Sequence, residues 1–303
     1  MTLQQLRYAI EIEKCGSLSK AAKKLFVSQP NLSNSMKDLE TEFGITIFKR
    51  NNRGVQITEK GATFLIYARS VLNQCKEMKS ISEDKSSSSF RLIAQNYSPI
   101  MESFIKFVKL NSDNEKIKYE LTNERGFEVI DKVYKQEADL GVLLIMEDTR
   151  DEFITHLEDR NLSYTPLGKL AFFVKVRSGH PVLEHKETIF HELYKYPYVH
   201  YKESMYIHQT DVYSNDYLEF INYNKEIHVF DRNVKCKIVS ETNAYSIGCK
   251  MHSHLSEMFD WVLIPIPDVY TEIGYFHKKS IPMGVESQKY IELLKDELKG
   301  LIL

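Results

Sequence analysis

The feature that most constrains this chain is the stretch 17–40, whose pattern predicts two short helices joined by a tight turn. Ser17 and Ser28 suit the N-cap positions of these helices, because a serine oxygen accepts hydrogen bonds from the free N–H groups of an opening turn. Pro30 falls in the first turn of the second helix, where its missing N–H costs nothing. The first helix is expected to close into the core through three apolar residues, Leu25, Phe26 and Val27.

The second helix of this pair has one apolar and one polar face. Its buried stripe, at helical spacing, is predicted to be Leu32, Met36, Leu39 and Phe43. The opposite face carries polar, mostly uncharged side chains that can pair with base edges in a major groove: Gln29, Asn31, Ser33, Asn34 and Lys37. This is the layout of a helix-turn-helix with its recognition helix second. The alternative is a solvated amphipathic helix pair without a role in DNA binding, but the flanking residues favour the helix-turn-helix.

Those flanking residues, 47–58, predict a short hairpin, or wing. Val55 and Ile57 alternate after a turn at Gly54, as expected of a strand. Arg50 and Arg53 lie beside the turn and suit contacts with phosphates.

Residues 1–89 resemble the winged helix-turn-helix and linker helix of the LysR-type transcriptional regulators. The matching positions are Leu3, Leu6, Tyr8, 17–25, Ser28-Gln29-Pro30, Leu32-Ser33, Leu39-Glu40 and 48–61. Asn31 stands where the family usually has a small apolar residue, and Asn34 and Ser35 replace the common Arg, Thr, Gln or Ala. The resemblance implies a bacterial DNA-binding regulator, and these departures are expected to alter which operator is read.

Nine residues are expected at the DNA: Ser28, Gln29, Pro30, Asn31, Ser33, Asn34, Lys37, Arg50 and Arg53. Gln29, Pro30 and Asn34 sit where base edges are reached, and the two amides can each pair two-point with an adenine. Ser28, Ser33 and the three basic residues are expected to hold phosphates and the wing.

Charge is unevenly divided along the 303 residues, whose formal net charge is −2. Residues 1–80 carry 13 Lys and Arg against 7 Asp and Glu, a balance of +6, and the remainder carries −8. A basic N-terminal part and an acidic C-terminal part suit a nucleic-acid-binding domain attached to a domain that does not bind DNA.

No secretory signal, long apolar run or CxxC spacing is seen in the sequence. We therefore expect a cytoplasmic protein with reduced thiols and no membrane partner.

A long helix is predicted from Thr58 to about residue 81. Its apolar positions are spaced as in a coiled-coil seam: Leu65, Ala68, Leu72 and Cys75. An identical chain is the expected partner, and a dimer would read an interrupted inverted repeat. The alternative is a helix packed on its own domain. The four serines 86–89 are expected to mark a flexible boundary.

Beyond residue 90, alternating strand and helix patterns predict a parallel α/β sheet. This region resembles the LysR-type effector domain, which has the fold of a two-lobed periplasmic binding protein. The expected division is therefore a winged helix-turn-helix at 1–58, a linker at 59–89 and a regulatory domain at 90–303. The resemblance divides that domain into lobe I (about 90–164 and 268–303) and lobe II (about 165–267). Within lobe II, helices are expected at 207–221 and 242–251, and a strand at 235–240.

A small anionic or amino-acid-like effector is expected between the lobes. Ser98 and Thr242 are predicted to open helices that point into this cleft, where free N–H groups suit a carboxylate. The residues expected at the effector are Asn96, Ser98, Asn123, Tyr201, Thr242 and Asn243.

Other readings remain open but are less favoured. Cys236 and Cys249 leave a redox-responsive member of the family as an alternative. His252 and His254 leave a metal-responsive one, but on a helix the two diverge and no carboxylate lies at ligand spacing beside them, so no metal or cofactor is expected. A solute-binding protein is disfavoured because no signal peptide is seen. An enzyme is disfavoured because the sequence contains no GxSxG, Walker, GxGxxG or HExxH motif. The expected partners are double-stranded DNA, the effector and further copies of the chain, as dimer or tetramer, with RNA polymerase as a further candidate.

Overall fold

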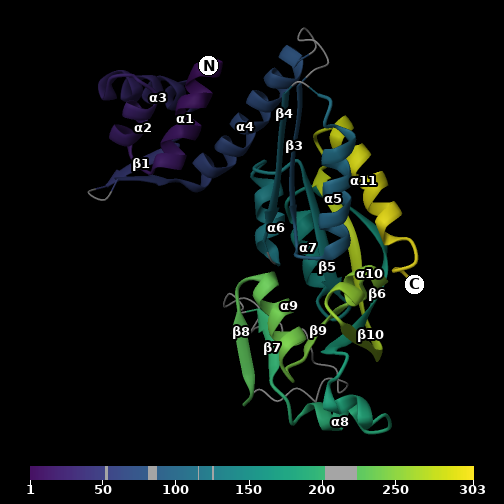
Figure 1. The fold of residues 1–303 in the computed structure, drawn as a ribbon. Coiled ribbons are helices and arrows are strands. Elements are labelled where there is room, and N and C mark those ends of the chain that lie inside the picture. Colours follow the sequence, from purple (N-terminus) through teal and green to yellow (C-terminus); the bar gives the residue numbers. More distant parts are fainter. Residues whose placement is uncertain (52–53, 81–86, 115, 125, 202–223) are drawn as a thin grey trace. The chain divides into compact units, whose positions relative to one another are not determined.

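The computed structural model of the chain describes residues 1–51, 54–80, 87–114, 116–124, 126–201 and 224–303 (Figure 1). Backbone contacts divide the chain into two compact units. The first comprises Met1–Ser88 with the short segments Asn114–Ile117 and Tyr134–Glu137, and the second comprises the remainder. In the described residues no helix is both long and apolar enough to cross a membrane.

The N-terminal unit contains a three-helix domain, a hairpin and a long helix. Its elements are α1 (Leu3–Cys15), α2 (Leu18–Lys24), α3 (Gln29–Phe43), β1 (Phe48–Asn51), β2 (Gly54–Ile57) and α4 (Glu59–Ser80). Ser17 and Ser28 cap α2 and α3 as expected, each accepting the N–H three residues along, at 3.5 and 3.3 Å. Thr58 does the same for Gly61 at 2.9 Å and Thr2 for Gln5 at 3.2 Å, so a hydroxyl cap begins each of the helices α1 to α4.

The apolar faces of these helices meet in one core, built from Ala9, Ile12, Leu18, Ala21, Ala22, Leu32, Met36, Leu39, Ile47 and Leu65. The expected stripe of α3 is buried as far as Leu39, whereas Phe43 in the last turn is 45% exposed. The expectation that Phe26 enters the core is wrong. Its φ of 56° turns the chain out of α2, and its side chain is 95% exposed while Leu25 and Val27 pack on the core.

The wing is a two-stranded antiparallel hairpin that is anchored to the end of α1. Phe48 pairs with Ile57 at one end of the hairpin, and the Val55 N–H donates to the Gly16 carbonyl at 3.0 Å. A Cβ at Gly54 would lie 2.5 Å from that carbonyl oxygen, so the close approach of the wing to α1 requires glycine here.

The C-terminal unit is built on a six-stranded sheet of order β4-β3-β5-β10-β6-β9. Its strands are β3 (Ser87–Ala94), β4 (Lys116–Asn123), β5 (Leu140–Met146), β6 (Leu162–Arg177), β9 (Ser246–Cys249) and β10 (Trp261–Lys278). β3 and β5 are parallel, but β10 runs antiparallel to β5 and β6, so the sheet is mixed where a parallel one was expected. β7 (Tyr198–Tyr201) and β8 (Glu226–Val229) form a separate parallel pair.

Helices flank this sheet. They are α5 (Ser98–Leu110), α6 (Phe127–Tyr134), α7 (Arg150–Asp159), α8 (Ile189–Leu193), α9 (Arg232–Glu241), α10 (Ser253–Met258) and α11 (Val285–Leu298), with a 3₁₀ turn at Pro181–Glu184. α5 and α11 lie side by side (Figure 1), and Ser103 of α5 donates to the Tyr290 hydroxyl of α11 at 3.0 Å.

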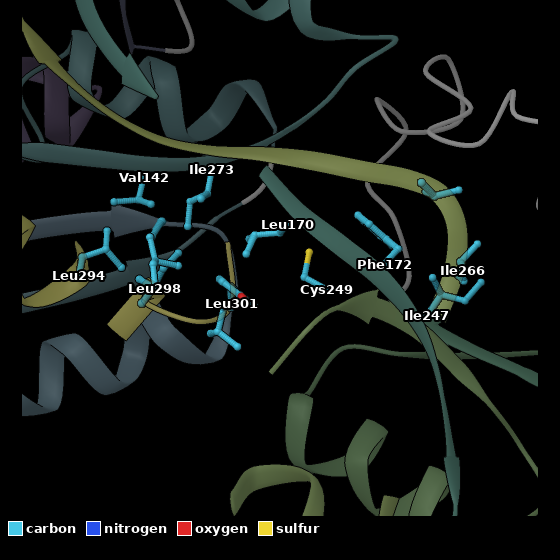
Figure 2. Close-up of a cluster of buried hydrophobic side chains, with 14 of the residues drawn as sticks. Val142, Leu170, Phe172, Ile247, Cys249, Ile266, Ile273, Leu294, Leu298 and Leu301 are labelled. Atoms are coloured by element: carbon cyan, nitrogen blue, oxygen red, sulfur yellow. The ribbon is translucent and has the colours of Figure 1, made fainter. Parts of the chain in front are cut away.

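The two longest strands, β6 and β10, link two lobes of this unit. Their pairing shifts register between Pro265 and Tyr270, where β10 leaves the β5 side of the sheet. Figure 2 shows the apolar core continuing along them, from Val142, Ile273, Leu294, Leu298 and Leu301 through Leu170 to Phe172, Ile247, Cys249 and Ile266. A continuous core of this kind holds the two strands rigidly beneath any cavity that lies between the lobes.

Three expectations for the second lobe need correction. The segment 235–240, expected as a strand, belongs to helix α9, because Asp231 caps it through the Val234 N–H at 3.0 Å and Cys236 and Val239 bury one face. The expected helix at 242–251 contains strand β9, which pairs with β6. The helix expected at 207–221 lies outside the described residues. At the predicted boundary between linker and regulatory domain, Ser87–Ser89 belong to β3, and Ser86 lies outside the described residues.

Candidate functional site

The polar face of α3 is exposed along the recognition helix. Gln29, Pro30, Asn31, Asn34 and Lys37 are all exposed, and Ser33 is half-buried. The apolar face of the same helix supports them, since Leu32, Met36 and Leu39 are at most 3% exposed. This division leaves two amides and one ammonium group on a rigid surface, which suits a major groove.

One base-reading candidate is already oriented by its neighbours. The Gln29 side-chain oxygen accepts a hydrogen bond from the Ser19 hydroxyl of α2 at 2.8 Å, which leaves its NH₂ group to donate outward. The surrounding basic groups on this unit include the exposed Lys20, Lys23 and Lys49. Arg53 lies outside the described residues, as does the side chain of Arg50, so their predicted phosphate contacts stay predictions.

The predicted dimer seam on α4 is partly used within its own unit. Leu65 is fully buried in the core of the N-terminal unit, and Ala68 is 2% exposed, so neither can face a partner helix as expected. Leu72 and Cys75 are half-buried. Leu65 points inward because α4 packs along α1, to which an Arg69–Glu13 ion pair also ties it.

A different face of α4 is open. Tyr67 is 67% exposed and Met78 is 68% exposed, with the half-buried Val71 and the exposed Gln74 between them. The spacing of 4, 3 and 4 residues puts these four side chains in one line on a helix. This line is a candidate coiled-coil seam, about a third of a turn around α4 from the one that the sequence predicted.

A cavity of about 840 Å³ opens in the C-terminal unit, beyond the carboxyl ends of β3 and β5. Its walls come from the segments 95–98, the start of α6, α7, β6, β7, α9 and β9. This position agrees with the rule that ligands bind beyond the carboxyl ends of strands in open α/β sheets, and its volume falls in the range of small-molecule sites.

The cavity brings together three of the six residues predicted at the effector. Asn96, Ser98 and Tyr201 line it, whereas Asn123, Thr242 and Asn243 do not. Thr242 ends α9 instead of opening a helix, and its hydroxyl donates to the Ile238 carbonyl at 2.7 Å. The Asn243 side-chain oxygen accepts from Arg177 at 2.7 Å, which keeps both residues out of the cavity. The idea of a second helix N-terminus at Thr242 is therefore wrong.

Ser98 is the first residue of α5, one position inside the cap that the sequence predicted. Tyr97 occupies the N-cap position without a side-chain cap, and Ser98 is 5% exposed. Its hydroxyl accepts a hydrogen bond from the Arg232 guanidinium at 2.6 Å. Ser98 thus orients a cation at the cavity wall.

The cationic groups of the cavity were missed by sequence reasoning. Arg232, Lys235 and Lys175 all line it, and burial lowers the pKa of Lys175 to about 8. The signal for Lys175 was available, since it interrupts an otherwise apolar run in strand 170–176. Arg232 and Lys235 could not be found, because that segment was assigned the wrong secondary structure.

Two buried hydroxyls also face this cavity. Ser246 Oγ and Thr271 Oγ1 line it, and neither has a hydrogen-bond partner among the described residues. Buried polar atoms are normally paired, so these two hydroxyls suit a bound polar ligand. The acidic side chains Glu128, Asp131 and Glu152 lie on the first-lobe wall, and Asp131 accepts from Arg160 at 2.9 Å.

The cysteines of the redox alternative line the same cavity. Burial raises the pKa of the Cys249 thiol to about 12 and also raises that of Cys236, where the neighbouring Arg232 and Lys175 only partly oppose it. A raised pKa disfavours the thiolate that reacts with oxidants, so both thiols act here as small apolar wall groups.

Comparison with known proteins agrees with this arrangement. The sequence pattern described as "Bacterial regulatory helix-turn-helix protein, lysR family" matches residues 3–62. The HTH-type transcriptional regulator ClcR of Pseudomonas putida is 40% identical over 73 residues, which are 24% of this chain and 25% of ClcR. The match therefore spans about a quarter of the length of that relative.

Two solved structures share the fold over nearly the whole chain. A full-length variant of OxyR from Pseudomonas aeruginosa is 18% identical, with a TM-score of 0.63, and covers 99% of this chain and 95% of that chain. CbnR in complex with its target DNA is 15% identical, with a TM-score of 0.54, and covers 98% of this chain and 100% of that chain. Identities this low establish the fold alone.

Fold and site together define the chain as a winged helix-turn-helix protein with a two-lobed α/β C-terminal domain. The N-terminal match is more specific. Residues 3–62 match the LysR family of bacterial regulatory helix-turn-helix proteins, and the chain shares the fold of the full-length OxyR structure.

Proposed function

We propose that this protein is a cytoplasmic transcriptional regulator that binds double-stranded DNA through α3 and the wing and responds to a small effector in the C-terminal cavity. The observation that carries the proposal is the exposed amide face of α3, within the residues that match the family. Its role is binding and not catalysis, in keeping with ClcR, which is named as a transcriptional regulator.

DNA recognition divides between reading and positioning. Asn34 and Gln29 present amides, which pair two-point with adenine, and they stand on a helix held by a buried stripe. Lys37 and the basic residues around the wing would neutralise phosphates without reading sequence. The N-terminal charge of +6 over residues 1–80 supports the same role, because it attracts the polyanion at long range.

Self-association through α4 would give the protein two recognition helices. The line Tyr67, Val71, Gln74 and Met78 is the face that we assign to a second copy. An exposed seam of this kind gains stability when an identical helix covers it. A two-fold dimer would then read an interrupted inverted repeat.

The effector is proposed to carry a carboxylate or another small anionic group. Arg232, which Ser98 orients, and Lys175 supply the positive charge, and Ser246 and Thr271 supply hydroxyls without partners among the described residues. The acidic wall opposite favours a second, positively charged end, so amino acids and related zwitterions belong to the same class.

A footprint on the DNA immediately upstream of its own gene and the divergent neighbour tests the proposal. We expect protection of a roughly two-fold symmetric site at low salt. The Asn34→Ala variant should lose that protection, whereas Lys299→Ala, a surface change on the C-terminal unit, should keep it. Lack of specific protection there and in a genome-wide selection of bound fragments would contradict the proposal.

A further inference from the structure

Four potential metal ligands from three separate segments meet on the C-terminal unit, away from the effector cavity. They are Glu102 on α5, Glu297 on α11, and His252 and His254 at the start of α10. Three of them, Glu102, His252 and Glu297, have donor atoms that all lie within 4.8 Å of one another. No local sequence pattern predicts this cluster, because its carboxylates lie about 150 and 45 residues away from the histidines along the chain.

The two histidines converge, contrary to the expectation from their spacing. His252 is the N-cap of α10, with extended backbone angles of −61° and 146°, so it does not follow the helical turn. The two rings consequently stack with centroids 5.7 Å apart and planes 18° apart. Both rings direct their Nε2 atoms at Glu102, at 3.8 Å for His252 and 3.1 Å for His254.

Three of these donors are spaced for coordination of one ion. His252 Nε2 lies 3.2 Å from Glu297 Oε2 and 3.8 Å from Glu102 Oε2. His254 Nε2 lies 3.1 Å from the other Glu102 oxygen, Oε1, outside the group of three whose donors are all mutually close. With bonds of about 2.0 to 2.1 Å, two ligands of a tetrahedral Zn²⁺ ion stand about 3.3 Å apart. Two imidazoles and two carboxylates are a ligand set that Zn²⁺ and similar divalent transition metals accept.

The buried polar atoms of the cluster lack other partners. Glu102 Oε2 and His252 Nε2 are buried, and neither makes a hydrogen bond with the described residues, although each faces the other. The Glu297 side chain is only 7% exposed, and its second oxygen meets the Lys106 ammonium. The Glu297 carboxylate is buried and that of Glu102 is partly buried, and a divalent cation would add positive charge to that of Lys106. Lys106 would then hold the Glu297 carboxylate in place through its ion pair, as outer partners of metal ligands commonly do.

A second cluster of possible ligands is less suitable. His200, Glu226 and His228 lie on the adjacent strands β7 and β8, with Glu226 at 3.6 and 2.8 Å from the two imidazoles. The His228 side chain is 40% exposed, so this cluster is less enclosed than the first and serves as an internal control.

We propose that Glu102, His252 and Glu297 form a binding site for one divalent transition-metal ion per chain, with the exposed His254 turning in as the fourth ligand. Such an ion would tie α5 and α11 to the segment between β9 and β10. That segment already contacts α5 through the Tyr97 hydroxyl, which donates to the Lys250 carbonyl at 2.8 Å. The site is independent of the proposed role in transcription.

The test uses the full chain without a polyhistidine tag, stripped with a chelator and titrated with Zn²⁺ in a calorimeter. We expect one tight site per chain. His252→Ala and Glu102→Gln should each weaken it more than about 100-fold, because even the outer partners of metal ligands contribute about 10- to 100-fold. His228→Ala, in the second cluster, should leave the tight site unchanged.

The His254→Ala variant provides a second test in case His252→Ala or Glu102→Gln disturbs folding. The His254 side chain is 65% exposed, so its removal leaves the core intact and should still weaken Zn²⁺ binding. The absence of a tight site in the parent chain would overturn the proposal. Retention of the tight site in His252→Ala and His254→Ala, or its loss in His228→Ala, would overturn it as well.

Discussion

At the scale of single residues, α3 carries both the amides that we propose to read bases and the ammonium group that we propose to contact the DNA backbone. Asn34 and Lys37 are both exposed and stand one turn apart on the same helix, so their substitution tests that division directly. An amide can discriminate among bases, whereas an ammonium group acts as a point charge.

Asn34→Ala is expected to change the ranking of operator sequences. The loss of a two-point contact should remove about 1–3 kcal/mol of discrimination at one base pair. Lys37→Ala should instead weaken binding to all sequences alike and reduce the slope of log K against log salt by about 0.9. Fluorescence anisotropy with a panel of single-base operator variants at several salt concentrations measures both effects. Similar behaviour of the two variants would refute the division.

Lys175 links the chemistry of the cavity to stability. Burial lowers its pKa from 10.5 to about 8. Below pH 8 the lysine is charged in the folded and the unfolded chain, so the cost of burying the charge is fully present. Between about pH 8 and 10.5 only the unfolded chain keeps the proton, so this residue makes stability rise with pH over that window.

Lys175→Met should therefore raise the thermal midpoint of the C-terminal unit at pH 7, by an amount that corresponds to at most about 3 kcal/mol. The gain should shrink as the pH approaches 10.5. Thermal unfolding followed by circular dichroism from pH 7 to 10.5 measures it, with the exposed Lys289→Met as control. An unchanged or lower midpoint at pH 7 would show that the charge is not buried at a cost.

At the scale of elements, the N-terminal unit follows closely from the sequence. Ser17 and Ser28 are N-caps, as predicted. Leu32, Met36 and Leu39 form the buried face of α3 that their spacing predicts. Local signals dominate here, because each helix carries its own cap and its own apolar period. Phe26 is the exception, since its backbone at φ 56° follows from the geometry of the turn and not from hydrophobicity.

The second lobe was harder to predict because tertiary pairing decides it. The segment 246–249 is a strand only because β6 offers a partner with matching register, such as Lys175 beside Ser246. The helix α9 depends on one cap, Asp231, which precedes a run that reads equally well as a strand. The prediction of cavity residues depended on these secondary-structure assignments, so Ser98 and Tyr201 were identified whereas Arg232 was not. Likewise, no local pattern joins Glu102 to His252.

The corrected seam on α4 gives an element-scale prediction. Tyr67→Glu or Met78→Glu places a charge on the open face and should shift the protein toward monomers, as measured by sedimentation equilibrium. Ala62→Glu, an exposed change on another face of α4, should not. Leu65→Ala should instead destabilise the N-terminal unit by about 2–5 kcal/mol, because this side chain is in its core. A dimer that survives Tyr67→Glu with Met78→Glu would exclude this face as the interface.

At the scale of the whole molecule, the proposed DNA-binding surface and the proposed effector cavity lie in different units, and the charge differs in sign between the two parts of the chain. Residues 1–80 carry +6 and the remainder −8, so the phosphate backbone is attracted to one unit and repelled by the other. Within the acidic unit, Arg232 and Lys175 create a local positive site inside the cavity. Changes in the cavity should therefore alter the effector response without changing the affinity of the effector-free protein for DNA.

Arg232→Gln tests this separation. In the parent chain, the matching carboxylate or amino acid should raise the thermal midpoint of the C-terminal unit, by an equivalent of about 2.7 kcal/mol at 100 times its Kd. Arg232→Gln and Ser98→Ala should lose most of this stabilisation, since the guanidinium and the hydroxyl that orients it are 2.6 Å apart at the cavity wall. Arg177→Gln is the matched control, because Arg177 pairs with Asn243 outside the cavity. An undiminished response in Arg232→Gln would place the effector elsewhere, and a parallel loss of operator affinity would show that the two units are not separable in this way.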